Sequence, residues 1–299
     1  MTLELSRGSF RLVVDPDLGG AILRADWRDM DGRDVAIFEP SEPTFDPFGN
    51  GCYALVPFAN RIADGRFSFE GRDYELPINR PQENVAIHGF AYERPWEVAR
   101  ATSNSVSLFQ RFAESDNPYE YEAWQEISLL DEGLQIEVSV RNAGDRAMPF
   151  GLGIHPWFAR SLGTTLAFLS QGTFEQDTRN LPLPKLRQVA AFNPDHPVRM
   201  EDVPVIDGCF ANWTPLHARI VRPQEGVVFE ITAGGALRHL HVFVPDNRNV
   251  FCAEPVSHVP DVVNRPEFGP AHAMDVLQPG EVLSGAMTLR AKIHSSVGG

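Results

Sequence analysis

The sequence predicts an all-β protein built as a large antiparallel β-sandwich or barrel. Short segments in which apolar and polar residues alternate recur along the whole chain. The 24 glycines and 24 prolines divide the 299 residues into segments of strand length. Long windows with the spacing of an amphipathic helix are scarce. Because neither an internal repeat nor a dividing linker is visible, we expect a single domain over residues 1–299.

The first strands expected from local pattern form a hairpin over residues 66–76. Phe67 and Phe69 alternate with polar residues before a Glu-Gly pair, and Tyr74 and Leu76 alternate after it. Two alternating runs joined by such a short turn are typical of a β-hairpin.

A second clear pattern predicts a half-buried strand in the middle of the chain. Leu134, Ile136, Val138 and Val140 fall on one face of an extended segment, and the residues between them are polar or charged. An Asn-Ala-Gly turn follows. Later segments with the same pattern, the last of them a closing strand, span residues 226–235, 237–246 and 285–293.

Residues 171–206 interrupt this rhythm. The segment contains scattered charges, asparagines and prolines, and it shows little alternation. It predicts a long irregular connection, which is either a wall over a binding site or a solvated insertion.

Charge and cysteine content restrict the class of protein. The net charge of −14 argues against nucleic acid or an anionic membrane surface as a partner. The first residues contain no basic segment followed by an apolar run, and no apolar stretch approaches the length of a bilayer. Cys52, Cys209 and Cys252 are few and form no CxxC pair. We therefore expect a cytoplasmic protein.

The segment "MPFGLGIHPWF" contains the most conspicuous candidate residue, His155. Pro149 and Pro156 restrict the backbone around it, and Gly151 and Gly153 permit close backbone approach. A rigidly held imidazole is suited to general acid catalysis near neutral pH. The alternative is a loop histidine that only hydrogen-bonds to the backbone.

A second histidine, His88, precedes Gly89, where a ligand can approach the backbone. Phe90, Tyr92 and Trp96 follow and could provide a flat apolar surface for the face of a sugar ring. The alternative is a core histidine among packed aromatic residues.

Two acidic residues are candidates for proton transfer or binding. Glu254 ends an apolar run and is followed at once by Pro255, so partial burial would raise its pKa and make it a better base. Asp207 lies in an apolar setting before Gly208. The alternatives are a glutamate leaving the core for solvent and an ordinary Asp-Gly turn.

The remaining candidates are an arginine and a histidine pair. Arg61 follows Asn60 and could present its planar guanidinium to hydroxyls or a carboxylate, although a structural salt bridge is the alternative. His239 and His241 share one face of a strand at a spacing that metal sites use. Because the sequence offers no third ligand at a diagnostic interval, we expect both on the solvent face.

The order of these motifs resembles one family. Asn-Arg-Ile, His-Gly, His-Pro-aromatic-Phe, an Asp turn and Glu-Pro follow one another as in the aldose 1-epimerases, also called galactose mutarotases. The resemblance covers nearly the whole chain. It implies a single-domain antiparallel β-supersandwich that interconverts the α and β anomers of a free sugar. It also implies that neither a metal nor an organic cofactor takes part.

The resemblance further implies roles for individual residues. Glu254 matches the general base and His155 the general acid, which implies a carboxylate and an imidazolium before the reaction. Arg61, His88 and Asp207 match residues that hold the hydroxyls and ring oxygen of the sugar.

Asn60 and Trp157 complete the expected binding set. Trp157 stands where many relatives have tyrosine, the segment before Asn60 is "VPFA" rather than a Gly-Arg pair, and His88 is followed by Gly-Phe. These departures affect which sugar binds and leave the acid and base in place. Whether the protein is a monomer or a homodimer stays open.

Three alternatives remain at the level of sequence. A hexose-6-phosphate 1-epimerase would need a cationic pocket, for which Arg61, Arg80 and Arg94 are candidates, but a Phe-Pro-x-Phe-Gly stretch of that branch is missing. A non-catalytic sugar-binding protein would use Trp96 and Trp157 as stacking platforms. A glycoside hydrolase normally uses two carboxylates, and only one stands out.

Overall fold

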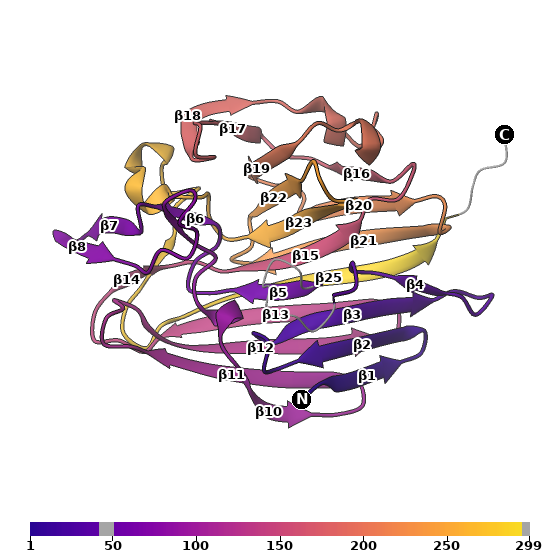
Figure 1. The fold of residues 1–299 in the computed structure, drawn as a ribbon, viewed down its shortest axis with the longest axis horizontal. Helices are drawn as coiled ribbons and strands as arrows, with labels where there is room; N and C mark the ends of the chain where they lie inside the picture. Colours follow the sequence, from indigo (N-terminus) through magenta and orange to yellow (C-terminus); the bar gives the residue numbers. More distant parts are fainter. Residues whose placement is uncertain (42–50, 295–299) are drawn as a thin grey trace.

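Two large antiparallel sheets dominate the molecule (Figure 1). The computed structural model describes residues 1–41 and 51–294. One sheet has eleven strands and the other has eight, and the pairings between named strands are antiparallel. Helical structure in the described residues consists of short 3₁₀ turns. The predicted all-β fold class is confirmed.

The eleven-stranded sheet has the order β1-β2-β3-β5-β15-β23-β22-β19-β17-β18, with β4 paired to β3. Its strands are β1 (Leu3–Arg7), β2 (Phe10–Asp15), β3 (Ala21–Arg28), β4 (Asp34–Ala36), β5 (Cys52–Leu55), β15 (Gly153–Ala159), β17 (Gly172–Gln176), β18 (Pro182–Arg187), β19 (Ile206–Ala211), β22 (His239–Val244) and β23 (Val250–Val256).

The eight-stranded sheet has the order β10-β11-β12-β13-β25-β21-β20-β16. Its strands are β10 (Glu97–Ala101), β11 (Ser105–Ala113), β12 (Glu120–Leu130), β13 (Gly133–Asn142), β16 (Thr165–Phe168), β20 (His217–Arg222), β21 (Val227–Gly235) and β25 (Val282–Ile293).

Short elements complete the described chain. Three pairs of strands form small sheets: β6 (Arg61–Ala63) with β9 (Val85–Ile87), β7 (Arg66–Phe69) with β8 (Arg72–Glu75), and β14 (Met148–Phe150) with β24 (Asp275–Leu277). The 3₁₀ turns are η2 (Ala91–Glu93), η3 (Ala190–Phe192), η4 (Met200–Asp202), η5 (Val262–Asn264) and η6 (Pro266–Phe268).

The strands with the clearest sequence patterns are confirmed. In the β7–β8 hairpin, Phe67 lies opposite Tyr74, and Glu70 and Gly71 both have positive φ, as the tight turn requires. Strand β13 alternates between buried and more exposed residues, as predicted from residues 134–140. The segments expected near the C-terminal end of the chain form β21, β22 and β25.

The interior of the molecule is one continuous cluster of buried apolar residues drawn from both large sheets. Its side chains include Leu12 of β2 and Leu134 of β13. In β13 the buried residues alternate with polar ones, so one face packs and the other meets water. In β15 and β23 almost every residue is buried, so both faces of these central strands are covered.

The prediction of an irregular connection over residues 171–206 is correct for residues 188–205, which contain two 3₁₀ turns and no strand, and wrong for the part before them. The segment contains β17, β18, η3, η4 and the first residue of β19. Strand β18 lies at the edge of the eleven-stranded sheet, and all but its first residue are exposed. Prolines are tolerated on an edge strand, and an exposed edge has no reason to alternate. This is why the pattern was not visible in the sequence.

No helix within residues 1–41 and 51–294 is long and apolar enough to cross a membrane.

Candidate active site

Neighbouring strands of the eleven-stranded sheet carry polar side chains at the same level. The register places Tyr53 of β5 opposite His155 of β15, and His241 of β22 opposite Glu254 of β23. The register of β15 against β23 brings His155 level with Glu254. Because residues directly opposite one another share a face, these side chains lie in a row. Asp207 of β19 joins the row through its Oδ1, 2.8 Å from His241 Nε2.

A cavity opens to solvent above this row. The segments around β6 and β9 provide its opposite wall. All seven residues expected from the sequence line it: Asn60, Arg61, His88, His155, Trp157, Asp207 and Glu254. Arg80, Ile87, His241 and Phe243 also line it.

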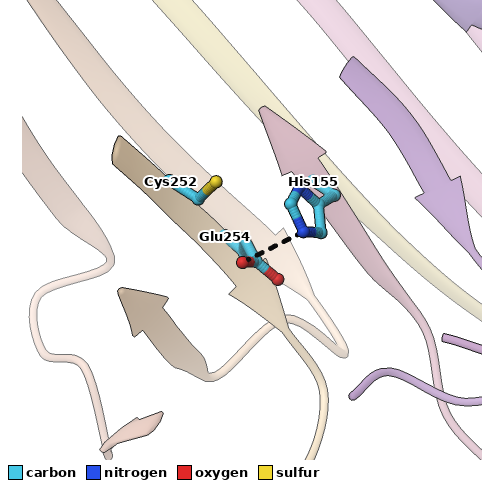
Figure 2. Close-up of side chains that lie close together, drawn as sticks. All are labelled: His155, Cys252 and Glu254. Carbon is cyan, nitrogen blue, oxygen red and sulfur yellow. Dashed lines mark ion pairs between the residues drawn. The ribbon is translucent and has the colours of Figure 1, made fainter. Parts of the chain in front are cut away.

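His155 and Glu254 form a buried pair at the base of the cavity (Figure 2). His155 Nε2 lies 3.3 Å from Glu254 Oε1, and the residues are only 3% and 1% exposed. Burial raises the pKa of Glu254 to about 7 and lowers the pKa of His155 to about 3. Between these two pH values the pair therefore holds one proton, which lies on Glu254 in the unliganded site.

Aromatic rings hold the imidazole of His155 in place. Tyr53 stacks on it with ring centroids 4.6 Å apart, and His88 meets it edge-on at 5.1 Å. The glycines before it serve backbone packing, as expected, because a Cβ on Gly151 would lie 2.1 Å from Cδ2 of His258. His155 is thus a fixed strand residue, and the alternative of a loop histidine is wrong.

Arg61 is held from three sides. Its Nε donates to Glu83 Oε2 at 2.7 Å, its Nη2 to Asp207 Oδ2 at 2.9 Å, and its Nη1 to Asn60 Oδ1 at 3.1 Å. Burial alone would raise the pKa of Asp207, but the charge of Arg61 and the hydrogen bond with His241 hold that pKa well below its usual range. The arginine therefore presents a fixed orientation to the cavity.

His88 has one defined tautomer. The backbone N–H of Asn60 donates to its Nδ1 at 3.2 Å, so the ring proton lies on Nε2. Burial holds the pKa of His88 well below its usual range, so the ring is neutral. Both residues have positive φ, which turns the chain sharply at the cavity wall.

The comparison with known proteins decides the family. The family model described as aldose 1-epimerase matches residues 1–290. The chain belongs to the aldose 1-epimerase family. It is 31% identical over 298 residues to YphB of Escherichia coli K12, covering 96% of this chain and 98% of that protein. It is 27% identical over 262 residues to the galactose mutarotase of Pongo abelii, covering 75% and 73% of the two chains.

Solved structures agree with the family assignment. A structure from Escherichia coli K12 matches with a TM-score of 0.86 at 30% identity, covering 98% of this chain and 99% of that one. A galactose mutarotase-like protein from Clostridium acetobutylicum matches with a TM-score of 0.86 at 20% identity, covering 98% and 95%, and supports the fold alone. The family and its galactose mutarotase relatives support a carbohydrate epimerase with a small sugar as its partner.

The histidine pair of β22 in this aldose 1-epimerase family member is not where the sequence predicts it. His239 and His241 were expected on the solvent face, but both are buried, because β22 lies inside the sheet and is covered on both faces. His241 lines the cavity and contacts Asp207. The missing signal was the strand register that sets His241 opposite Glu254, which a single sequence does not display.

The expected aromatic surface at residues 90–96 also differs. Phe90, Tyr92 and Trp96 are buried in the core and do not line the cavity. Gly89 is needed for a close approach by the backbone of Val56, where a Cβ would lie 2.1 Å from the carbonyl oxygen, and not by a ligand. Aromatic content alone does not distinguish a core segment from a cavity wall.

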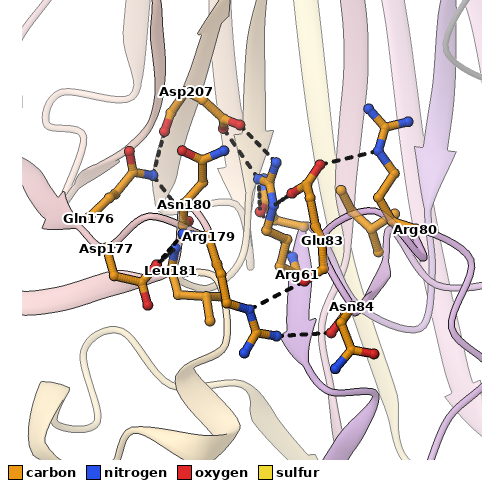
Figure 3. A network of polar contacts seen from close by, with 12 residues as sticks. Arg61, Arg80, Glu83, Asn84, Gln176, Asp177, Arg179, Asn180, Leu181 and Asp207 are labelled. Atoms are coloured by element: carbon orange, nitrogen blue, oxygen red, sulfur yellow. Dashed lines mark hydrogen bonds and ion pairs between the residues drawn. The ribbon is translucent and has the colours of Figure 1, made fainter.

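A network of polar contacts connects residues 176–181 to the site (Figure 3). The side chain of Gln176 donates to the backbone oxygen of Asp207. Arg179 donates to the backbone oxygens of Glu83 at 3.3 Å and Asn84 at 2.9 Å. The turn between β17 and β18 thus supports residues behind the cavity and does not line the cavity itself.

One cluster in the described residues could hold a metal ion. The ligand atoms of His155, Cys252 and Glu254 lie within 4.8 Å of one another (Figure 2). Three protein ligands are the usual number for a catalytic zinc. Burial and the charge of Glu254 hold the pKa of Cys252 well above its usual range, so a metal would have to displace the thiol proton. It would also occupy the His155–Glu254 pair.

Proposed function

We propose that this family member is an aldose 1-epimerase that interconverts the α and β anomers of a hexose. Glu254 acts as general base and His155 as general acid. The observation that carries the proposal is the buried 3.3 Å pair facing a cavity lined by hydrogen-bonding side chains. Within residues 1–41 and 51–294, His155 Nδ1 and Glu254 Oε2 are buried without a hydrogen-bond partner. Buried polar atoms of this kind suit a polar ligand.

Opening a hemiacetal ring requires two coupled proton transfers. Glu254 removes the proton of the C1 hydroxyl while His155 protonates the ring oxygen as the C1–O5 bond breaks. The open aldehyde rotates about C1–C2, and the reverse transfers close the ring in either configuration. Each general acid or base contributes roughly a hundred- to ten-thousand-fold. The cycle restores both groups, so no covalent intermediate is needed.

The protonation state of the unliganded site corrects the sequence expectation. His155 was expected as an imidazolium, but burial lowers its pKa to about 3. The reactive form, with a carboxylate on Glu254 and an imidazolium on His155, contains the same single proton. A transfer across the 3.3 Å between the two side chains interconverts the two forms. The working enzyme is therefore the pair with one proton bound.

The other cavity residues orient the sugar. Arg61, His88 and Asn60 supply donors, and Asp207 supplies a carboxylate held by Arg61 and His241. Trp157 and Phe243 supply an apolar wall. The guanidinium of Arg248 lies 4.6 Å from the Trp157 ring centroid and covers part of the tryptophan that was expected to stack on the sugar.

The arginines that could bind a phosphate group are already paired with carboxylates, which favours an uncharged sugar. Arg61 and Arg80 are both paired with Glu83. Arg94 does not line the cavity and pairs with Glu114 at 2.6 Å. We further propose that the protein is a single domain. We also propose that it is cytoplasmic, since Cys52, Cys209 and Cys252 are buried free thiols, in keeping with a reducing compartment.

Anomeric exchange measured by saturation-transfer NMR tests the function. Free and 6-phosphorylated aldoses are compared, with a chelator present, for the wild type and for Glu254→Gln. We expect accelerated exchange of a free hexose that disappears in the variant, while sugar binding persists. Intact binding with no acceleration for any sugar would reject the enzyme and indicate a sugar-binding protein on the same fold.

A further inference from the structure

His241 occupies a central position among the charged groups of the cavity. It lies opposite Glu254 in the register of β22 and β23, and its side chain is only 2% exposed. Its Nε2 is 2.8 Å from Asp207 Oδ1. An imidazole between two carboxyl groups, one of them hydrogen-bonded to it, is well placed to carry a positive charge.

We propose that His241 is a positioning residue of the acid–base site, whose positive charge, held by Asp207, weakens the hold of Glu254 on the shared proton and so favours its transfer to His155. This inference rests on the proposed function and deepens it. His241 acts through Glu254 and Asp207 and needs no bond to the reacting atoms of the sugar.

The charges around the cavity support a cationic His241. The titratable groups nearest to it are Asp207 and Cys209 of β19, Glu254 of β23, His155 of β15 and the neutral His88. The nearby guanidinium groups are those of Arg61 and Arg80, and both pair with Glu83. Asp207, Glu254 and Glu83 are three potential anions, whereas Arg61 and Arg80 are two cations. When the His155–Glu254 pair has lost its shared proton, a charge on His241 balances the site.

Asn60 does not compete for the proton of His241. Its Oδ1 already accepts from the backbone N–H and the Nη1 of Arg61. Its Nδ2 is 3.3 Å from one ring nitrogen of His241 and 3.5 Å from the other. An amide nitrogen only donates hydrogen bonds, so it cannot accept a proton from the ring. Asp207 is therefore the partner that determines the state of the ring.

The other buried histidines of this region behave differently. Burial lowers the pKa of His155 and of His239 to about 3. Burial also acts to lower the pKa of His241, but the hydrogen bond to Asp207 and the charge of Glu254 outweigh it, and the net direction is upward. His239 lies two residues away on the same face of β22, so it is a matched control for position and burial.

The test follows the titration of the Glu254 carboxyl group by NMR in unliganded protein. His241→Gln keeps a neutral donor toward Asp207 and removes the charge. We expect the Glu254 titration to move upward by about one pH unit and kcat to fall by about tenfold with little change in KM. His241→Lys, which restores a cation, should return the titration toward the wild-type value. His239→Gln should leave it unchanged.

Two results would overturn the inference. One is a loss of activity in His241→Gln with no movement of the Glu254 titration, which would indicate a structural role. The other is measured on the wild type and so does not depend on whether the variants fold. It is an NMR signal showing that the His241 imidazole is neutral at pH 6, where a protonated ring is expected. Both titrations use unliganded protein, so they decide the inference even if no sugar proves to be a substrate.

Discussion

The eight-stranded and eleven-stranded sheets differ in whether their second face is covered. In the eight-stranded sheet, β13 buries one face and presents the other to solvent. In the eleven-stranded sheet, β15 and β23 are buried on both faces, because the segments around β6 and β9 cover the face that carries His155 and Glu254. The first sheet therefore supports the core, and the second supports the core and also carries the proposed acid–base pair.

Two glutamates illustrate the consequence. Glu137 of β13 faces solvent, where its charge is hydrated. Glu254 of β23 is buried, and its pKa rises to about 7. The same side chain on the same type of strand is thus suited to the proposed role of base only where the second face is covered. The cost is a less stable charged form at neutral pH, as is common for active sites.

The largest expected effect is on activity, and it compares one histidine from each large sheet. Replacing His155 with asparagine removes the proposed acid, so we expect kcat for anomeric exchange to fall by about a hundred-fold or more. His217 of β20 in the eight-stranded sheet is the matched control, and His217→Asn should retain full activity. Equal losses in the two variants would mean that the covered face has no special role.

The pH dependence of kcat/KM tests the shared proton. The pair loses its proton as pH rises through about 7, because burial raises the pKa of Glu254 to that value. We therefore expect kcat/KM to be level from pH 5 to 6.5 and to fall by about tenfold per pH unit well above 7. Activity that rises steadily from pH 6 to 9 would contradict a one-proton working form.

Stability should fall as the pH rises, as activity does. The folded-state pKa of Glu254 is about 7, above the ordinary value of 4.5, so the folded protein binds this proton more tightly. That stabilisation is complete below pH 4.5 and is lost as pH rises through 7. Glu254→Gln avoids the loss, and we expect it to be more stable than the wild type at pH 8 by about 1–3 kcal/mol.

Denaturant unfolding at pH 5 and pH 8 measures this difference. The advantage of Glu254→Gln should grow between the two pH values, whereas Glu137→Gln on the eight-stranded sheet should show no such growth. If the difference in unfolding free energy between Glu254→Gln and the wild type were the same at both pH values, folding would not raise the pKa of Glu254.

The smallest expected effect concerns the arginine excluded from the cavity. Arg94 pairs with Glu114, and both side chains are 39% exposed. An ion pair at this exposure contributes little, so Arg94→Ala should change kcat/KM by about twofold or less for free and phosphorylated sugars. A selective loss of activity on a phosphorylated sugar would bring back the phosphate-binding alternative.

The two sheets also explain which predictions from sequence succeeded. Strand β13 was predicted because one face meets water, which forces alternation of apolar and polar residues. Both faces of β22 are buried, so its burial does not follow an alternating pattern, and His241 was expected on the solvent face. Strand β18 was missed because an exposed edge strand with prolines does not alternate.

The candidate site was predicted as a set of residues and not as an arrangement. Asn60, Arg61, His88, His155, Trp157, Asp207 and Glu254 all line one cavity. Phe90, Tyr92 and Trp96 were expected there too, but they pack in the core. Ile87 and Phe243 line the cavity without any sequence signal, because no local pattern marks a residue that becomes a wall through distant pairing.

The fold class and the residue types available for chemistry follow from the amino-acid sequence alone, because strand alternation and turn residues are local properties. The 3.3 Å separation of His155 Nε2 from Glu254 Oε1 and the position of His241 opposite Glu254 are visible only in the folded chain. These features depend on strand register and on coverage of the second face. Both arise from contacts between residues far apart in the chain, and burial then sets each pKa.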